Sequence, residues 1–373
     1  MEKRSIINLV KIFMKYKQQF IIRVFFLFLL SIFIVKIYPI NHLESDRIAE
    51  FIHIGSAQPT HSNNHVSYPF TLVDGYNRNV TFKEEPQRII SIAPSVTEVI
   101  YAVGADDKLV AVDLSSNYPN ETENLPKIAN FPTLDVEAII VLNPDLIFGA
   151  GITSLEDVEG LENQGFSVFI LAPFNVEDVL EDIEVVGRIT NHESEASTLK
   201  DSLQARINTI EQNVTKYTFK PKIYIEYFSE PLYTYGKGTY GHDLIELAGA
   251  INMAENATGL YPQIDDEFVI TQNPDIIFYA KGSWTTTNAS TISSRTGWNI
   301  INAVKNGHIY PINEDWISRG GPRIVKALEE IHSKVKLVTS QSDRDRSITP
   351  AFEWYWVLVM IPISVVIGIK RRS

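Results

Sequence analysis

Apolar and polar positions along the chain predict strands and helices in turn. The stretch from Pro86 to Val112 (PQRIISIAPSVTEVIYAVGADDKLVAV) begins with β-branched residues between Ile89 and Ile92, which are typical of a buried strand. Pro94 ends that strand, and Ser95-Val-Thr-Glu fits a capping box that opens an apolar helix. The pattern predicts a strand, a helix and a second strand, with the carboxylate of Glu98 near the start of the helix.

The same kind of unit occurs twice in the chain. Leu134 to Ala150 (LDVEAIIVLNPDLIFGA) matches Ile264 to Ala280 (IDDEFVITQNPDIIFYA), each an acidic helix followed by Asn-Pro-Asp and a strand. Upstream of each copy, Glu98 to Ala105 (EVIYAVGA) matches Leu244 to Ala250 (LIELAGA), a helix that ends in Gly-Ala. The sequence therefore predicts two similar α/β lobes.

The segment between the two copies has helical spacing. Apolar residues recur from Val176 to Val186 and again from Ala196 to Ile210, with a break expected near Asn191. We expect one long helix to join the lobes. Because a helical connector is stiff, only a modest change in lobe angle is expected when a ligand binds.

Strongly apolar segments lie near both ends of the chain. Phe20 to Ile40 follows a basic run and is predicted to be a signal segment or an anchor, and Trp354 to Ile369 is predicted to be a membrane anchor that ends against Lys370. Basic residues flank the outer ends of both segments, so the positive-inside rule places both termini in the cytoplasm. The globular part is then expected outside the cell, bound to the cell membrane.

Composition excludes several classes of protein. A formal net charge of −12 argues against a nucleic-acid reader, and the absence of cysteine excludes disulfides, thiolate sites and a lipidated cysteine. Acceptor patterns of the form N-x-[ST] favour an archaeal cell-surface protein over a bacterial lipoprotein. These patterns begin at Asn79, Asn120, Asn213, Asn256 and Asn288. Neither a phosphate-binding glycine loop, nor G-x-S-x-G, nor H-E-x-x-H occurs, so an enzyme is not expected.

The motifs, taken in order, resemble a known family. The series VTEVIYAVGADDKLVAV, SNYP, LDVEAIIVLNPDLIF, LIELAGA, NPDIIF and WISRGGPRIVKALEEI is similar to substrate-binding proteins of ABC importers for vitamin B12, ferric siderophores and haem. The resemblance covers about Tyr68 to Val338. It implies an α/β fold with two similar doubly wound lobes joined by a long rigid helix. The flanking hydrophobic segments are predicted from the apolar runs instead, and the C-terminal one departs from the usual member of the family.

The resemblance and the apolar runs at both ends together set the expected organisation of the chain. The expected parts are an N-terminal signal or transmembrane segment (1–40), a polar spacer (41–67), the first α/β lobe (68–174), a helical connector (175–216), the second α/β lobe (217–338), a polar spacer (339–350) and a C-terminal transmembrane anchor (351–373). The chain would be a monomer that works with an ABC permease and its ATPase subunits. It carries no ATPase motif of its own, and no cofactor is expected.

The resemblance implies a ligand site at the carboxyl ends of the strands, where open α/β sheets bind ligands. The residues that it places there are Tyr118, Phe131, Tyr235, Trp284, Trp316 and Arg319. Flat rings suit a metal chelate such as cobalamin, haem or a ferric siderophore, although ordinary packing is the alternative for each ring. Arg319 would pair with an anionic group of the ligand, whereas Arg323 would anchor its loop. The motif SNYP favours cobalamin, and the choice of chelate stays open.

A docking role for two carboxylates is also implied by the resemblance. In the family, a glutamate on a corresponding helix of each lobe contacts the transporter, and the matching positions are Glu98 and Glu246. The alternatives are a helix cap for Glu98 and a solvated helix face for Glu246.

Two further functions are weighed against transport of a chelate. A receptor for bare zinc or manganese would need clustered histidines and carboxylates, but His53, His61 and His65 fall in the polar spacer. His242 could ligate the metal of a bound chelate, or it could be structural. A surface adhesion protein would account for the anchors, but it would not account for the duplicated lobes.

Overall fold

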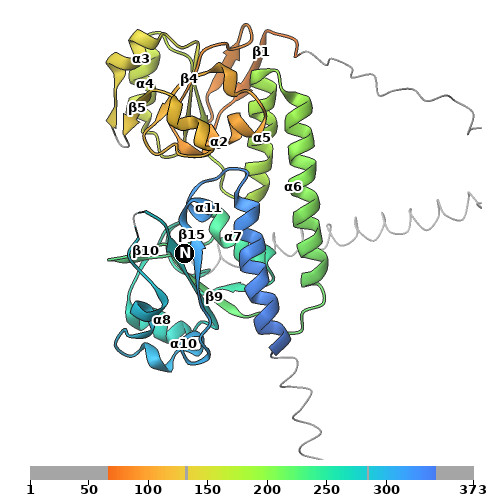
Figure 1. The fold of residues 1–373 in the computed structure, drawn as a ribbon, viewed down its shortest axis with the longest axis vertical. Helices are drawn as coiled ribbons and strands as arrows, with labels where there is room; N and C mark the ends of the chain where they lie inside the picture. Colours follow the sequence, from red (N-terminus) through yellow and green to blue (C-terminus); the bar gives the residue numbers. More distant parts are fainter. Residues whose placement is uncertain (1–65, 131–132, 284, 342–373) are drawn as a thin grey trace, which may run out of the picture. The chain divides into compact units, whose positions relative to one another are not determined.

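The computed structural model describes residues 66–130, 133–283 and 285–341, and within them two parallel sheets form the cores of two lobes (Figure 1). The predicted hydrophobic segments 1–40 and 351–373 lie outside the described residues, as do Phe131 and Trp284. Over the described ranges, no helix is both long enough and apolar enough to span a bilayer. The anchors therefore stay predictions.

Lobe 1 is built on a six-stranded sheet with the order β6-β5-β4-β3-β7-β8, parallel except for the β5–β6 pair. Its strands are β3 (Ile89–Ser91), β4 (Leu109–Asp113), β5 (Lys127–Asn130), β6 (Thr133–Leu134), β7 (Leu146–Ala150) and β8 (Val168–Leu171). Its helices are α2 (Pro94–Ala102), α3 (Val136–Leu142) and α4 (Leu155–Asn163), with short 3₁₀ turns at η2 (Asp106–Lys108) and η3 (Asn120–Asn124). A separate antiparallel hairpin, β1 (Phe70–Val73) and β2 (Asn79–Phe82), precedes the sheet.

Lobe 2 is built on a four-stranded parallel sheet with the order β12-β9-β14-β15. Its strands are β9 (Lys222–Glu226), β12 (Ile251–Asn252), β14 (Ile276–Lys281) and β15 (Ile309–Asn313), and a small antiparallel sheet contains β10 (Phe228–Ser229), β11 (Leu232–Tyr233) and β13 (Gln263–Ile264). Its helices are α7 (Tyr240–Leu247), α8 (Asp266–Gln272), α9 (Ala289–Ser293), α10 (Asn302–Asn306) and α11 (Glu314–Ser318), with a 3₁₀ turn at η4 (Trp298–Ile300). A final helix covers residues 324–341.

Each sheet is covered on both faces, because successive residues of a strand point to opposite sides. In β3, Ile89 belongs to a core that is continuous through both lobes, whereas Ile90 belongs to a second core within lobe 1. In β9, Ile223 and Ile225 belong to the continuous core, and Tyr224 lies in a third core within lobe 2. This burial explains the near-continuous apolar runs of these strands.

The internal repeat is present in the structure, down to single hydrogen bonds. Asp135 caps α3 and Asp265 caps α8, each accepting a hydrogen bond from a backbone N–H three residues later. The aspartate of each Asn-Pro-Asp motif then accepts a hydrogen bond from the backbone at the start of the neighbouring strand. Asp145 accepts from the N–H of Arg88 at 3.0 Å, and Asp275 accepts from the N–H of Lys222 at 2.9 Å.

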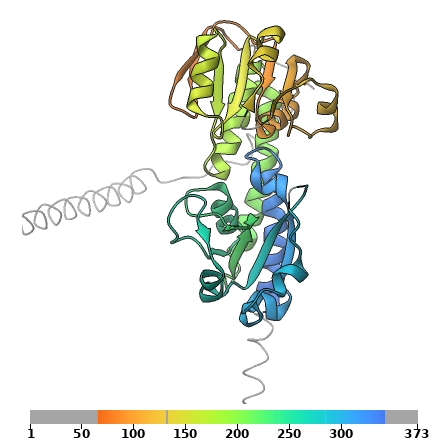
Figure 2. The same cartoon turned by 90° about the vertical axis from the view of Figure 1, so that its left-hand side faces the viewer.

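The connector is a pair of helices where one long helix was expected. α5 (Val176–Thr190) and α6 (Glu193–Val214) pack side by side (Figures 1 and 2), and the predicted break at Asn191 is confirmed as a left-handed residue with φ of 62°. At their closest approach, a Cβ on Gly187 would lie 2.3 Å from the Cβ of Ala196. A glycine is therefore required where the two helices meet.

Candidate functional site

Loops after the carboxyl ends of the strands expose apolar side chains. We call these residues the apolar loop set: Leu114, Tyr118, Ile152 and Phe174 in lobe 1, and Phe228 and Tyr261 in lobe 2, each between 40% and 59% exposed. Open α/β sheets bind ligands at this end of the sheet, so exposed apolar side chains there are candidates for a binding surface. Of this set, only Tyr118 was singled out from the sequence. The signal for Phe174 and Phe228 was their place two or three residues after a buried strand.

Tyr118 lies on a loop that is firmly held. Asp113, at the end of β4, accepts a hydrogen bond from the N–H of Ser115 at 2.9 Å and another from the hydroxyl of Ser116. Burial raises the pKa of the Asp113 carboxyl, and these hydrogen bonds oppose the rise. The guanidinium carbon of Arg323 lies 4.1 Å from the centre of the Tyr118 ring. One face of the ring is thus already covered by a cation.

Glu98 lies at the junction of the two lobes and is buried. The residue is 3% exposed, and its carboxylate receives two hydrogen bonds from Arg323, including Nε to Oε2 at 2.7 Å. Arg319 adds a third, Nη1 to Oε1 at 3.0 Å. Burial lowers the pKa of Arg323, but the hydrogen bond and charge of Glu98 more than offset this and the pKa is raised overall.

Arg319, the predicted anion-binding residue, is engaged by lobe 1 and by its own helix. Nη1 also donates to the side-chain oxygen of Asn117 at 3.0 Å, and Nη2 lies 3.3 Å from the carbonyl of Ser115 and 2.7 Å from Asp315. Its side chain is 11% exposed. A contact between Arg319 and a ligand stays a prediction, but a ligand anion would have to compete with these partners.

The expected exposure of Tyr235 is wrong, because the side chain is fully buried. Its hydroxyl donates to the carbonyl of Ile317, and the hydroxyl of Tyr240 donates to the carbonyl of Ser318 at 2.9 Å. Burial raises the pKa of both tyrosines, so they remain protonated donors. Tyr235 therefore holds the end of α11, directly before Arg319, and does not face a ligand.

Trp316 is half-buried, with the Nζ of Lys326 5.9 Å from its ring centre. Its role as a ligand contact stays a prediction, as do the roles of Phe131 and Trp284, which lie outside the described residues. At the start of α11, Glu314 accepts from the N–H of Ser283 at 2.5 Å. α11 is thus fastened at one end to the loop before Trp284 and at the other to the tyrosines.

The predicted capping box at Glu98 is also wrong. α2 begins at Pro94, its N-cap is Ala93, and no side chain caps it. Proline at the first helical position has no N–H group, so the start of this helix has one donor fewer to satisfy. Glu98 instead faces inward, where residues far along the chain neutralise it.

Glu98 and Glu246 do not occupy equivalent positions in the repeat. The turns that end α2 and α7 align Gly104 with Gly249, with φ of 81° and 85°. In this register the counterpart of Glu98 is Asp243, three residues before Glu246. The side chain of Glu246 is 57% exposed, so its predicted docking role is open, whereas Glu98 has no exposed surface to offer in this conformation.

His242 is enclosed by protein partners. It is 7% exposed, its Nδ1 lies 3.2 Å from the amide nitrogen of Asn252, and its Nε2 lies 3.5 Å from Glu246. This arrangement favours the structural interpretation over metal ligation. Among the described residues, no group of three or more histidine, cysteine, aspartate or glutamate side chains could hold a metal ion.

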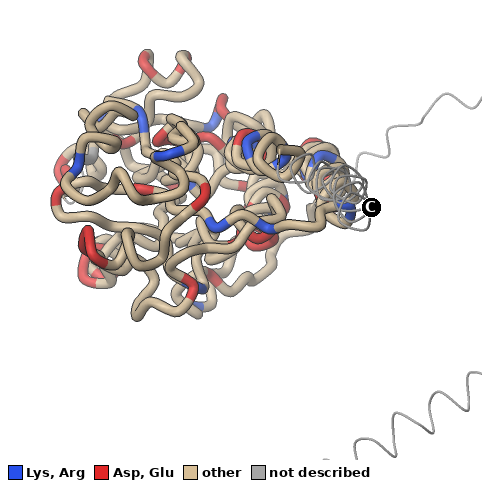
Figure 3. The backbone as a smooth tube through the Cα atoms, turned by 90° about the horizontal axis from the view of Figure 1, so that it is seen from below, with Lys and Arg blue, Asp and Glu red and all other residues tan. Residues whose placement is uncertain are grey.

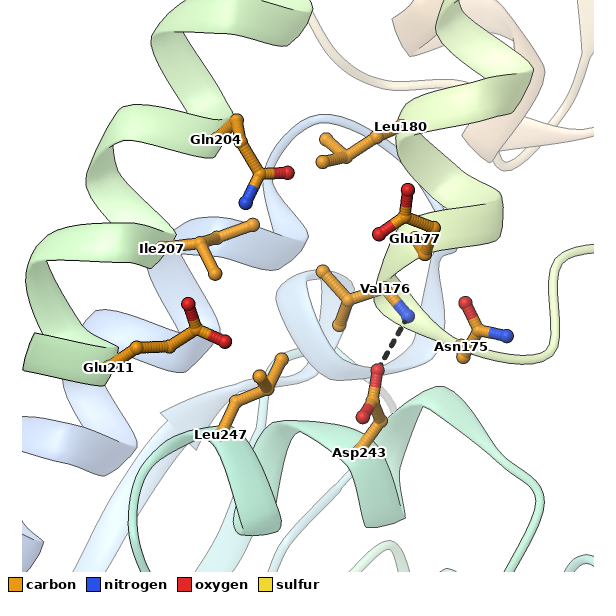
Figure 4. A pocket seen from close by; sticks show the side chains of 9 residues that line it. All are labelled: Asn175, Val176, Glu177, Leu180, Gln204, Ile207, Glu211, Asp243 and Leu247. Carbon is orange, nitrogen blue, oxygen red and sulfur yellow. Dashed lines mark hydrogen bonds between the residues drawn. The ribbon is translucent and has the colours of Figure 1, made fainter. Parts of the chain in front are cut away.

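A pocket of about 350 Å³ lies between α5, α6 and α7 (Figure 4). Leu180, Ile207 and Leu247 line it together with the carboxylates of Glu177, Glu211 and Asp243. Asp243 accepts from the N–H of Val176 at 2.8 Å. This carboxylate is therefore used by the fold.

Positive and negative residues are interspersed over the described backbone in Figure 3.

With two α/β sheets on one connector and apolar loops at the carboxyl ends of their strands, the chain has the architecture of a two-lobed binding protein. Its relatives belong to the same class. Residues 89–315 match the family model described as periplasmic binding protein.

Curated relatives include an uncharacterized ABC transporter substrate-binding lipoprotein, YvrC, of Bacillus subtilis, 30% identical over 72% of this chain and 86% of that protein. A vitamin B12-binding protein of Vibrio parahaemolyticus is 28% identical over 68% of this chain and 91% of its own length. The chain belongs to the periplasmic binding protein family. It is a substrate-binding component of an ABC importer and not an enzyme.

Solved structures share the fold. The vitamin B12-binding protein of Vibrio cholerae superposes with a TM-score of 0.60 at 25% identity, covering 68% of this chain and 97% of that one. A heme-binding protein from Roseiflexus sp. RS-1 gives 0.61 at 24% identity, with 67% and 97% covered. The relatives named here are bacterial, and an archaeal origin stays a prediction.

Proposed function

We propose that this protein captures a large, uncharged metal chelate of the corrinoid type between its lobes and delivers it to a membrane permease. The observation that carries the proposal is the apolar loop set together with the charge balance beside it. Arg319 and Arg323 are two cations at the junction, and Glu98 and Asp315 already pair with them. These two arginines are therefore balanced by two carboxylates before any anionic ligand arrives.

The charge balance separates the candidate chelates. Haem carries carboxylates and ferric catecholates carry several negative charges, so both are best bound by unpaired arginine or lysine. A corrinoid presents a broad ring edged with neutral amides, which suits exposed aromatic and aliphatic side chains. The similarity to vitamin B12-binding proteins supports the same choice.

Calorimetric titration of the full chain in detergent with cobalamin, haemin, a ferric catecholate and zinc tests the ligand. Saturable binding of cobalamin alone is the expected result. Tyr118→Ala should weaken it about tenfold, since an aromatic contact contributes roughly 1 kcal/mol or more. Val141→Ala, which changes an apolar residue that is 84% exposed outside the apolar loop set, is the control and should leave affinity unchanged. Binding of haemin or the catecholate without cobalamin would overturn the charge argument.

Docking to the permease needs carboxylates that are exposed at equivalent positions of the two lobes. Glu98 is buried and Glu246 has Tyr101 as its counterpart, so the pair chosen from the sequence does not meet this requirement. Glu137 in α3 and Glu267 in α8 do meet it. Both are exposed, and both lie two residues after the aspartate that caps the helix. We propose that these two glutamates contact cationic residues of the permease.

Reversal of these charges tests the docking proposal. The double change Glu137→Lys and Glu267→Lys should abolish ligand-stimulated ATPase activity of the permease in proteoliposomes while ligand affinity stays unchanged. Glu159→Lys, at another exposed helix position, is the charge-matched control. If Glu246→Lys abolishes the stimulation and the double change does not, Glu246 contacts the permease and Glu137 and Glu267 do not.

The apolar segments at 20–40 and 354–369 support a further proposal, that the protein is tethered to the cell membrane with its lobes outside. A tether raises the effective concentration of the lobes at the permease. Membrane fractionation of the full chain, compared with a chain lacking residues 351–373, tests the C-terminal anchor. Equal membrane retention of both chains would contradict an anchor at that end.

A further inference from the structure

We propose that Glu98 is an interlobe clasp, which holds the two lobes at a defined spacing and angle before any ligand is present. Glu98 lies on α2 of lobe 1, whereas its ionic partners, Arg319 and Arg323, follow α11 of lobe 2. The contacts join positions 221 and 225 residues apart. They are therefore contacts between lobes.

The burial of this cluster indicates a geometric role. The Glu98 side chain is 2% exposed, and those of Arg319 and Arg323 are 11% and 12% exposed. Burying charges costs desolvation energy, which the attraction between the charges offsets only in part. Apolar residues of similar size would therefore give a junction of comparable stability. What the charges add is direction, because the paired hydrogen bonds between a guanidinium and a carboxylate fix both distance and orientation.

Both sides of the clasp are rigidly supported. On the lobe 1 side, Arg319 also binds Asn117 and Ser115, whose loop is held by Asp113. On the lobe 2 side, the hydroxyls of Tyr235 and Tyr240 hold the last carbonyls of α11. Because neither loop can move freely, a rotation of one lobe against the other would distort the hydrogen bonds of the clasp directly.

The backbones of the two lobes also meet at the clasp. A Cβ on Gly321 would lie 3.3 Å from the carbonyl oxygen of Ser95, and a Cβ on Gly320 would lie 2.7 Å from Pro173. These glycines allow the loop after α11 to approach lobe 1 closely enough for Arg319 and Arg323 to reach Glu98. The close approach and the ion pairs are parts of one contact.

A second tie sits at the repeat-equivalent position. Asp243, the counterpart of Glu98, binds the N–H of Val176, where the connector leaves lobe 1. The carboxylate of each lobe thus reaches across to the structure that follows the other lobe. A second contact at a separate place adds to the orientation that the Glu98 ion pairs already fix.

Lobe spacing in the ligand-free full chain tests the proposal and does not depend on which ligand is transported. The chain has no cysteine, so Glu159→Cys in α4 and Lys305→Cys in α10, both exposed, provide the only sites for a pair of spin labels. Pulsed electron–electron double resonance should give one narrow distribution of the distance between the two labels. Glu98→Gln should broaden it and move it to longer distances, and Arg323→Lys, which loses the two-point contact, should broaden it less.

Two variants separate a clasp from a purely stabilising cluster. Glu98→Gln combined with Arg323→Gln leaves Arg319 balanced by Asp315, so the chain folds without an unpaired charge and should still show the broad distribution. Glu329→Gln removes a two-point pair with Arg206 at the surface and should keep the narrow one. If folded Glu98→Gln and the double variant retain the narrow distribution, Glu98 is not a clasp.

Discussion

The carboxylate of Glu98 and the guanidinium of Arg323 form a two-point ion pair between the lobes, with Nε 2.7 Å from Oε2 and both side chains almost fully buried. Arg323 also lies over the exposed ring of Tyr118. One arginine therefore contacts the interlobe carboxylate and a member of the apolar loop set. Lobe geometry and the proposed ligand surface meet at this side chain.

Removal of the Glu98 charge should destabilise the protein strongly. Glu98→Gln leaves Arg319 and Arg323, which are partly buried, with Asp315 as their only anionic partner, and breaking a pair with a buried member costs about 3–5 kcal/mol in the free energy of unfolding. Glu329→Gln, at a pair whose side chains are 44% and 36% exposed, should cost about 1 kcal/mol or less. Urea denaturation measures both, and equal losses would contradict the buried role of Glu98.

Loss of the Tyr235 hydroxyl should loosen α11 without opening a cavity. Tyr235→Phe keeps the buried ring and leaves the carbonyl of Ile317 without its donor, which should cost about 1–3 kcal/mol. Tyr76→Phe removes a similar bond to the carbonyl of Thr153 within lobe 1. Both should lower the melting temperature, but only Tyr235→Phe should broaden the interlobe distance. A broadened distance in Tyr76→Phe would contradict this.

Asp182 should make stability fall as pH rises. Burial first, and then the charges of Asp178 and Glu181, raise the pKa of this carboxyl in α5 from 3.8 to about 8, and its Oδ2 has no hydrogen-bond partner. Because the folded pKa lies above the unfolded one, the folded state holds the proton more tightly. The stabilising contribution is complete below about pH 3.8 and is lost as the pH rises through about 8.

The matching experiment replaces this carboxyl with a neutral amide. Asp182→Asn should raise the free energy of unfolding at about pH 8 by roughly 1–3 kcal/mol, and the gain should shrink as the pH falls toward 4. Thermal unfolding across this pH range measures it. A gain that does not depend on pH would show that ionisation of Asp182 is not the cause.

Two glycines in helices should respond oppositely to alanine. At Gly187 the new Cβ would collide with Ala196, so Gly187→Ala should force α5 and α6 apart and cost about 1–3 kcal/mol. At Gly160 in α4, a new Cβ would meet nothing within 4 Å, and Gly160→Ala should stabilise by about 0.5–1 kcal/mol. Melting temperatures distinguish the two. A stabilised Gly187→Ala would contradict the close helix contact.

The sequence predicted those elements of the fold that depend on residues close together in the chain. The Asn-Pro-Asp repeat, the strands around it and the break at Asn191 each depend on residues within a few positions, such as an aspartate cap or a left-handed asparagine. Parallel strands buried on both faces leave uninterrupted apolar runs, which the sequence also shows. The two α/β units were therefore visible without a structure.

The candidate site was harder to predict, because distant residues decide exposure. The neighbours of Glu98 in the sequence give the pattern of a helix cap, and the arginines that pair with it lie more than 220 residues away. Tyr235 lies in a polar, glycine-containing turn, yet the rings of Tyr227, Tyr240 and Tyr261 enclose it. When the turn glycines Gly104 and Gly249 are aligned, Glu246 corresponds to Tyr101 and not to Glu98.

The order in which the chain is synthesised gives the Glu98 contact a further consequence. All the strands of the lobe 1 sheet lie between residues 89 and 171, so this sheet can be complete before Arg319 and Arg323 have been made. Domains generally fold as units, the N-terminal one first. In a chain that stops before Arg319, Glu98 has neither of its cationic partners. The Glu98 contact can therefore form only after synthesis has passed both arginines and reached the final helix.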